Sequence, residues 1–92
     1  MIKSFANKPT EALWNGETPS QFAAFSKVAL RKLDMLNSAL ELTDLLVPPG
    51  NRLEALKGKR KGQYSIRIND QWRICFTWSN GEAGHVEIVD YH

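Results

Sequence analysis

Apolar residues recur at every third or fourth position from residue 22 to residue 40, a spacing typical of an amphipathic helix with one face toward a core. The helix is predicted to begin at residues 18–21, where a threonine cap, a proline suited to the first turn and a glutamine occur together. The pattern loosens at Asn37 and Ser38, so we expect a break there before a shorter segment through Leu46. A short helix is also predicted from Pro9 to Trp14. The expected core stripe consists of Phe22, Phe25, Ala29, Leu33, Leu36 and Leu40.

The helical part ends at residues 47–51, where two prolines and a glycine are incompatible with a helix interior. Beyond them apolar and polar positions alternate over residues 64–68 and 72–78, and apolar residues return at 86, 88 and 89, which predicts three strands. A further short strand is predicted over residues 2–5. The pattern therefore predicts a single α+β domain over residues 1–92, with N-terminal helices packed on one face of a small antiparallel β-sheet.

The register of the first hairpin follows from the same alternation. A three-residue loop at 69–71 places Ile66 opposite Ile74 on one apolar face, whereas a two-residue loop would mix polar and apolar side chains. This register sets Arg67 opposite Arg73 on the other face. Like charges so placed destabilise a sheet by a few tenths to about 1 kcal/mol unless a negative group lies between them. A bound anion and an internal acid, Glu82 or Glu87, both remain open as that group.

Length and composition limit what such a domain can contain. With 92 residues, 42% of them hydrophobic, the chain has room for one core, so a functional site is expected in a surface groove. No apolar run is long enough for a membrane span and the N-terminus lacks a secretory pattern, which predicts a cytoplasmic protein with no membrane partner. The single cysteine, Cys75, is expected to be a buried thiol, and the spacing of Cys75, His85 and His92 predicts no metal site.

Positive charge is concentrated in one short segment. The net charge is only +2, but residues 52–61 hold five cations and one acid. Crowding of this kind is typical of a phosphate-binding surface, and it also occurs in loops that are merely solvated. The cations are Arg52, Lys57, Lys59, Arg60 and Lys61, and the acid is Glu54.

The chain ends in Asp90, Tyr91 and His92, which combine proton-transfer groups with an aromatic ring. If the last strand pairs with the middle one, Tyr91 is expected on the face of the two arginines, with the chain end at its rim. Cleavage of RNA without a metal needs a base, an acid and cations near the phosphate, and these residues with Arg67 and Arg73 could supply them. Tyr91 could also stack on an unpaired base. A solvated tail is the alternative.

The segments LEALKG at 53–58 and GQYSIRINDQWRI at 62–74, followed by the terminal DYH, resemble the HigB toxins of the RelE/ParE superfamily. The likeness covers the whole chain in length and element order. It implies a RelE-like fold, ribosome-dependent cleavage of mRNA in the decoding site without a cofactor, and neutralisation by a HigA-like antitoxin with a helix-turn-helix DNA-binding fold.

The resemblance also assigns roles to residues of this chain. It implies catalytic roles for Lys57, Arg73, Asp90, Tyr91 and His92. Some relatives have a histidine where this chain has Glu54, so Glu54 is a candidate base beside His92 and Asp90. We expect RNA contacts from Arg52, Glu54, Lys59, Arg60, Lys61 and Arg67.

Two other functions fit the same sequence. ParE-like relatives share the fold and inhibit DNA gyrase without catalysis, and a basic face can also grip nucleic acid without chemistry. The terminal acid–base groups and Lys57 favour cleavage, because a protein that only binds has less need of proton-transfer groups.

Overall fold

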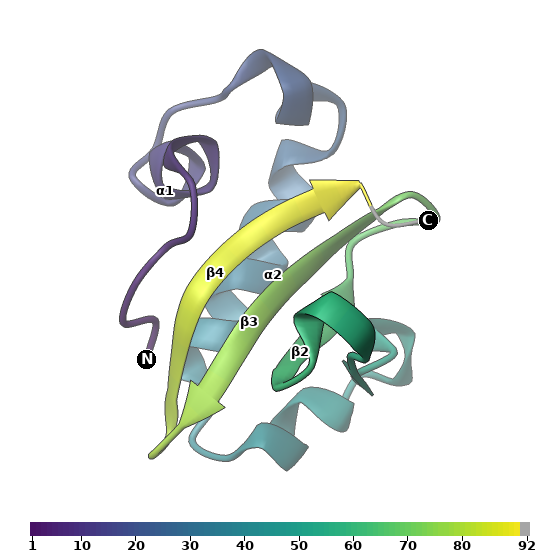
Figure 1. The fold of residues 1–92 in the computed structure, drawn as a ribbon. Coiled ribbons are helices and arrows are strands. Elements are labelled where there is room, and N and C mark those ends of the chain that lie inside the picture. The colour runs from purple at the N-terminus through teal and green to yellow at the C-terminus, as the bar shows by residue number, and fades with distance from the viewer. Residues whose placement is uncertain (91–92) are drawn as a thin grey trace.

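The computed structural model describes residues 1–90 and contains one four-stranded antiparallel sheet with helices on one face (Figure 1). The strands are β1 (Glu54–Ala55), β2 (Gln63–Arg67), β3 (Trp72–Ser79) and β4 (Glu82–Asp90), and they lie in that order across the sheet. The α-helices are α1 (Lys8–Trp14) and α2 (Ser26–Ser38). The predicted α+β class and the helix from Pro9 to Trp14 are therefore confirmed.

The face of the sheet that α2 covers is here called the inner face. The pairing of β2 with β3 has the predicted register on this face. Tyr64 lies opposite Phe76 and Ile66 lies opposite Ile74, while Ile74 also lies opposite Ile88 on β4. Side chains along β2 and β3 alternate between this face and the other, so their register buries the apolar set, while the pairing of β3 with β4 shifts register between Cys75 and Thr77. The core cluster joins them to α2 and includes Ala29, Leu33, Leu36, Ile66, Ile74, Phe76, Val86 and Ile88.

The long predicted helix is divided into two parts. A 3₁₀ helix, η1 (Ser20–Phe25), precedes α2, and Phe25 at the boundary has a backbone that is neither helical nor extended, with φ of −132° and ψ of 20°. The two phenylalanines of η1 pack on the same indole: ring centroids are 5.8 Å apart for Phe22–Trp72 and 5.2 Å apart for Phe25–Trp72. Residues three apart lie on one side of a 3₁₀ helix, so this winding lets both rings reach Trp72.

The prediction for Leu40 is wrong. The helix ends at Ser38, and Leu40 lies beyond it with 81% of its surface exposed. The Asp44 carboxylate accepts hydrogen bonds from the backbone N–H groups of Leu40 and Glu41, at 2.9 and 3.0 Å, and this turns the chain into the 3₁₀ helix η2 (Leu42–Leu46). The break expected at Asn37 and Ser38 and the shorter segment through Leu46 are therefore confirmed, and the local side-chain acceptor keeps Leu40 out of the apolar stripe.

The N-terminal segment lies along the free edge of β4. The expected strand over residues 2–5 appears as two parallel bridges, Ile2 with Ala83 and Phe5 with Val86. Asn7 then caps α1 by accepting the Thr10 N–H at 3.0 Å. Within residues 1–90 no helix has the length and apolarity that a membrane crossing requires.

The chain between Pro48 and β2 covers part of the other face, here called the outer face. The helical part is predicted to end at residues 47–51, but this segment contains two 3₁₀ turns, η3 (Pro49–Asn51) and η4 (Gly58–Arg60), on either side of the two-residue β1. Figure 1 shows η4 in front of the sheet and α2 behind it. Ser65 and Cys75, which alternation places on the outer face, are consequently fully buried.

Candidate functional site

The outer face is organised in rows of side chains that cross the sheet. One row runs Glu54, Ser65, Cys75, Glu87 from β1 to β4, and the next runs Arg67, Arg73, Val89 from β2 to β4. Residues directly opposite each other in antiparallel strands share a face, so each row is a line of neighbouring side chains. The predicted juxtaposition of Arg67 with Arg73 is confirmed.

The two arginines interact with different groups. Arg67 forms an ion pair with Asp70, which lies in the loop between β2 and β3. Neither acid considered from the sequence fills this position, because Glu87 pairs with Arg60 and Glu82 lies opposite Ser79 at the far end of the sheet. A carboxylate of the hairpin loop therefore offsets part of the charge of this pair.

Arg73 is held in place by oxygen atoms of two neighbouring segments. Its Nε donates to the Ser65 hydroxyl at 2.8 Å, and its Nη2 donates to the Arg52 carbonyl at 2.6 Å and to the Ser65 carbonyl at 3.4 Å. A planar guanidinium with two such anchor points has a defined orientation. Arg73 is thus a half-buried cation fixed on the outer face.

A second arginine ties η4 to the far side of the sheet. The Nη1 atom of Arg60 lies 2.7 Å from Oε1 of Glu87 and donates to Gln63 Oε1 at 3.1 Å. The other oxygen of Glu87 accepts a hydrogen bond from Asn7 at 3.4 Å. Arg60, which the sequence offered as an RNA contact, therefore also holds the basic segment against β4.

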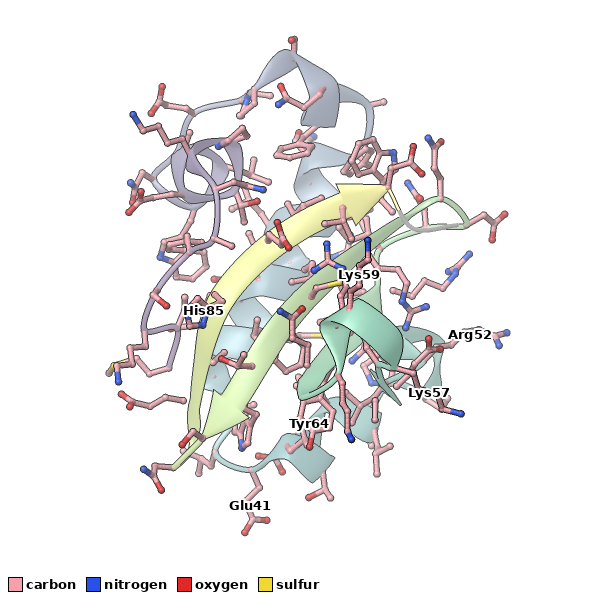
Figure 2. The ribbon with its side chains drawn as sticks, in the orientation of Figure 1. Glu41, Arg52, Lys57, Lys59, Tyr64 and His85 are labelled. Atoms are coloured by element: carbon pink, nitrogen blue, oxygen red, sulfur yellow. The ribbon has the colours of Figure 1, made fainter. Side chains whose placement is uncertain are left out.

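The remaining cations of the segment are exposed. Figure 2 shows Arg52 and Lys57 projecting on the β2 side of the sheet, Lys59 in front of the strands, and His85 on the opposite, β4 side. Lys61 is exposed as well, and so is Glu54, whose position opposite Ser65 brings it next to the residue that anchors Arg73. The structure thus gathers Arg52, Glu54, Lys57, Lys59, Arg60, Lys61, Arg67 and Arg73 on or beside the outer face.

The chain end is only partly within the described residues. Asp90 lies opposite Trp72, an inner-face residue, and its carboxylate accepts a hydrogen bond from Gln71 at 2.9 Å. The ladder thus assigns Asp90 to the face opposite that of Arg73, at the hairpin end of the sheet. Tyr91 and His92 lie outside the described residues, so their place beside Arg73 stays a prediction.

Two titratable groups near this region have altered affinities for protons. Burial raises the pKa of the Cys75 thiol, with smaller contributions from charged groups such as Arg60 and Glu87. Burial also lowers the pKa of Lys32 on α2, and the Arg31 and Arg67 guanidiniums act in the same direction. The thiol therefore remains neutral, and it serves as packing under η4 rather than as a nucleophile.

The sequence did not reveal Ser65 or Asn51 as parts of this region. Both are fully buried polar residues, and their partners lie on other elements. The sequence around a serine on the outer face of a strand does not indicate whether another segment will cover it. A surface hollow of about 160 Å³ lies at the other end of the sheet, between the N-terminal segment and the β3–β4 turn, and none of its lining residues belongs to the predicted site.

The fold and the outer face define a small α+β protein with fixed and exposed cations on one face of its sheet. The chain belongs to the family of HigB-like toxins, RelE-like toxins of type II toxin-antitoxin systems, whose family model matches residues 3–92. An antitoxin is accordingly the partner expected of a member of this family.

Relatives agree with this assignment, and a solved structure agrees with the fold. The chain is 33% identical to Endoribonuclease HigB of Proteus vulgaris over the full length of both proteins. It is 44% identical to Toxin HigB-1 of Vibrio cholerae serotype O1 over 61 residues, which span 66% of this chain and 64% of that toxin. The toxin–antitoxin complex YoeB–YefM of Staphylococcus aureus contains a chain of the same fold, with a TM-score of 0.64 and 23% identity over 100% of this chain and 95% of that one.

Proposed function

We propose that this toxin is an endoribonuclease that cleaves mRNA on the ribosome, without a metal ion, and thereby inhibits translation. The observation that carries the proposal is Arg73, a guanidinium fixed on the outer face of the sheet opposite Arg67, with the exposed cations of residues 52–61 on or beside the same face. The name of the Proteus vulgaris relative supports the reaction. The family assignment supports the role as a toxin.

The cations would stabilise the negative charge that develops on the phosphate during cleavage. A base removes the proton of a ribose 2′-hydroxyl, the 2′-oxygen attacks the adjacent phosphorus, and the bond to the 5′-oxygen breaks as an acid protonates that oxygen. The products are a 2′,3′-cyclic phosphate and a free 5′-hydroxyl. Negative charge accumulates on the phosphoryl oxygens in between, and a preoriented guanidinium stabilises it without reorganising. We assign this role to Arg73, supported by Lys57.

Proton transfer is assigned to the chain end and its neighbourhood. Imidazole is the side chain best suited to general acid–base catalysis, so His92 is the first candidate for proton transfer, with Asp90 and Tyr91 as further candidates. Glu54 supplies an exposed carboxylate one row from Arg73, in the position where some HigB relatives have histidine. Glu54 is therefore the second candidate base.

The partners follow the same proposal. Arg52, Lys59, Lys61 and Arg67 would contact the backbone of mRNA in the ribosomal decoding site, where the ribosome positions the substrate. A HigA-like antitoxin with a helix-turn-helix fold would neutralise the toxin, and the site of action would be the cytoplasm.

Mapping of mRNA 5′ ends after brief induction tests the proposal, with gyrase supercoiling assayed in parallel. We expect new 5′-hydroxyl ends inside translated frames, loss of these ends when the message lacks a start codon, and unchanged supercoiling. Cleavage by purified toxin on programmed ribosomes should persist in excess chelator. Inhibited supercoiling with intact mRNA would instead establish the gyrase inhibitor, and intact mRNA with normal supercoiling would leave a binding protein without cleavage activity.

A further inference from the structure

We propose that Ser65 and Asn51 are positioning residues that fix the direction of the Arg73 guanidinium. Ser65 acts by direct contact, and Asn51 acts through the backbone carbonyl of Arg52. The proposal rests on the function assigned to Arg73 above. It adds an explanation of how the flexible Arg73 side chain is held in one orientation.

Ser65 provides the first anchor. It is fully buried in the centre of β2, and its hydroxyl accepts the Nε–H of Arg73 at 2.8 Å across the β2–β3 ladder. A buried hydroxyl in a strand needs a partner, because an unpaired one is costly to desolvate. This bond fixes the Nε end of the guanidinium, where the group joins the aliphatic part of the Arg73 side chain.

The Arg52 carbonyl provides the second anchor, and its position depends on an unusual backbone. Arg52 has φ of 45°, in the left-handed region that residues other than glycine rarely adopt. It ends η3, and its N–H donates to the Pro49 carbonyl at 3.1 Å. This conformation directs the Arg52 carbonyl to Nη2 of Arg73 at 2.6 Å. A conformation of this kind persists only where the surroundings hold it.

Asn51 is the group that holds this turn. Its side chain is fully buried, and its amide nitrogen donates to the Leu45 carbonyl at 3.2 Å and to the Val47 carbonyl at 3.4 Å. Its amide oxygen accepts a hydrogen bond from Lys32 of α2 at 2.6 Å. One side chain therefore connects η2, the Pro48 turn and α2 immediately before Arg52. The turn cannot shift without breaking these hydrogen bonds, of which the one to Leu45 is buried.

This arrangement would matter for catalysis rather than for folding alone. An arginine has many rotamers, and a guanidinium that must be ordered during the reaction loses much of its effect. A side chain held at both Nε and Nη2 is already ordered before the RNA arrives. The anchors should therefore affect the cleavage rate on bound substrate more than they affect binding.

The test is a double-mutant cycle in single-turnover cleavage of mRNA on programmed ribosomes. Ser65→Ala removes the hydroxyl, and Thr77→Val removes a hydroxyl from the same face at a position remote from Arg73. We expect Ser65→Ala to lower the rate at saturating ribosomes by about tenfold to a hundredfold, as small misplacements of catalytic groups do. The concentration for half-saturation and the thermal midpoint should stay close to those of the parent. Thr77→Val should cleave at the parental rate.

The Arg73→Ala background separates positioning from a general structural effect. There, Ser65→Ala should cause no further loss, because the group that it orients is gone. Asn51→Asp, which exchanges the amide donors for a carboxylate facing two carbonyls, should behave like Ser65→Ala in both backgrounds. An unfolded Asn51→Asp protein would overturn its separate positioning role, while the Ser65 cycle still decides the proposal.

The outcomes distinguish this inference from the proposed function. A parental rate in Ser65→Ala, or a loss that is equally large in the Arg73→Ala background, would overturn the positioning role while leaving Arg73 as the phosphate-binding group. A parental rate in Arg73→Ala itself would refute the role assigned to Arg73 in the proposed function.

Discussion

The two faces of the sheet are both buried at their centres, but by different means. The inner face is covered by α2, and its Ile66, Ile74 and Phe76 make apolar contacts that need only size and shape. The outer face buries Ser65 and Cys75 to the same degree, but beneath η4, a segment linked to the sheet by the Arg60–Glu87 ion pair. Packing of the first kind provides stability, whereas directional contacts of the second kind orient charged groups.

This difference explains where a functional site can form on so small a domain. The inner face has no surface to spare for a ligand, because its apolar residues are needed for the core. The outer face can carry charge, since its directional bonds add only about 0.5–1.5 kcal/mol each and leave the core intact. We therefore expect substitutions of the inner-face core residues to reduce stability, and substitutions of the cations and their anchors on the outer face to reduce activity.

The largest effect is expected for the chain end, which we assign to the chemistry of the outer face. His92→Gln should slow cleavage by about 10²–10⁴-fold if His92 transfers a proton, with the free energy of unfolding unchanged. Single-turnover cleavage across pH 5–9 measures this and should also lose one limb of the pH profile. A parental rate in His92→Gln would shift the assignment to Glu54, and Glu54→Gln is the matched variant for that case.

The inner face should show the largest loss of stability. Phe76 is fully buried in the core, so Phe76→Ala should lower the free energy of unfolding by about 3–5 kcal/mol. Urea unfolding followed by tryptophan fluorescence measures this loss. Thr77→Ala, on the adjacent and partly exposed outer position, is the control and should lose less than about 1 kcal/mol. Similar losses at the two positions would contradict the distinction between the faces.

Arg73→Ala should show the reverse profile. Removing the fixed cation should reduce cleavage by about 10²–10³-fold, as removal of a preorganised donor does in other enzymes. The protein should remain folded, because Arg73 is only half-buried. Circular dichroism and urea unfolding check the fold. If Arg73→Ala is inactive because it has unfolded, the catalytic role assigned to Arg73 would lose its support.

A smaller effect is expected from the ion pair that holds η4. Glu87→Gln should cost about 1 kcal/mol or less, because both side chains are partly exposed, and should speed hydrogen exchange at the amides of Arg60 and Lys61. Asp70→Asn removes the Arg67–Asp70 ion pair, in which Asp70 is fully exposed, and should leave the stability and the exchange of the Arg60 and Lys61 amides unchanged. Unaltered exchange in Glu87→Gln would show that η4 does not depend on this contact.

The smallest effect concerns Cys75. Because burial raises its pKa, the folded protein should resist iodoacetamide at pH 8, whereas the urea-unfolded chain should react readily. The raised pKa implies stability that is present below the ordinary thiol value of 9.0 and lost as the pH rises through the higher value of the folded state. Mass spectrometry detects the alkylation. Rapid alkylation of the folded protein would show that η4 opens the outer face.

Much of the fold could be predicted because it depends on local periodicity. Alternation along β2 and β3 was sufficient to predict the hairpin register and hence the position of Arg67 opposite Arg73. Ala29, Leu33 and Leu36 of the predicted stripe are buried on α2, but Leu40 is exposed beyond the helix end, where its N–H donates to Asp44. In both cases the hydrophobic effect acts on neighbouring positions, so the pattern is visible in the sequence itself.

The sequence by itself determined the inner face, the basic segment and the family resemblance, because these features depend only on residue types and their spacing. Only the tertiary structure decided how the cations are held. Arg73 meets the Arg52 carbonyl across 21 residues, and Arg60 meets Glu87 across 27. A hydrogen bond between distant segments leaves no periodic mark, since its formation depends on atoms that come within about 3 Å only after the sheet and its covering turns have assembled.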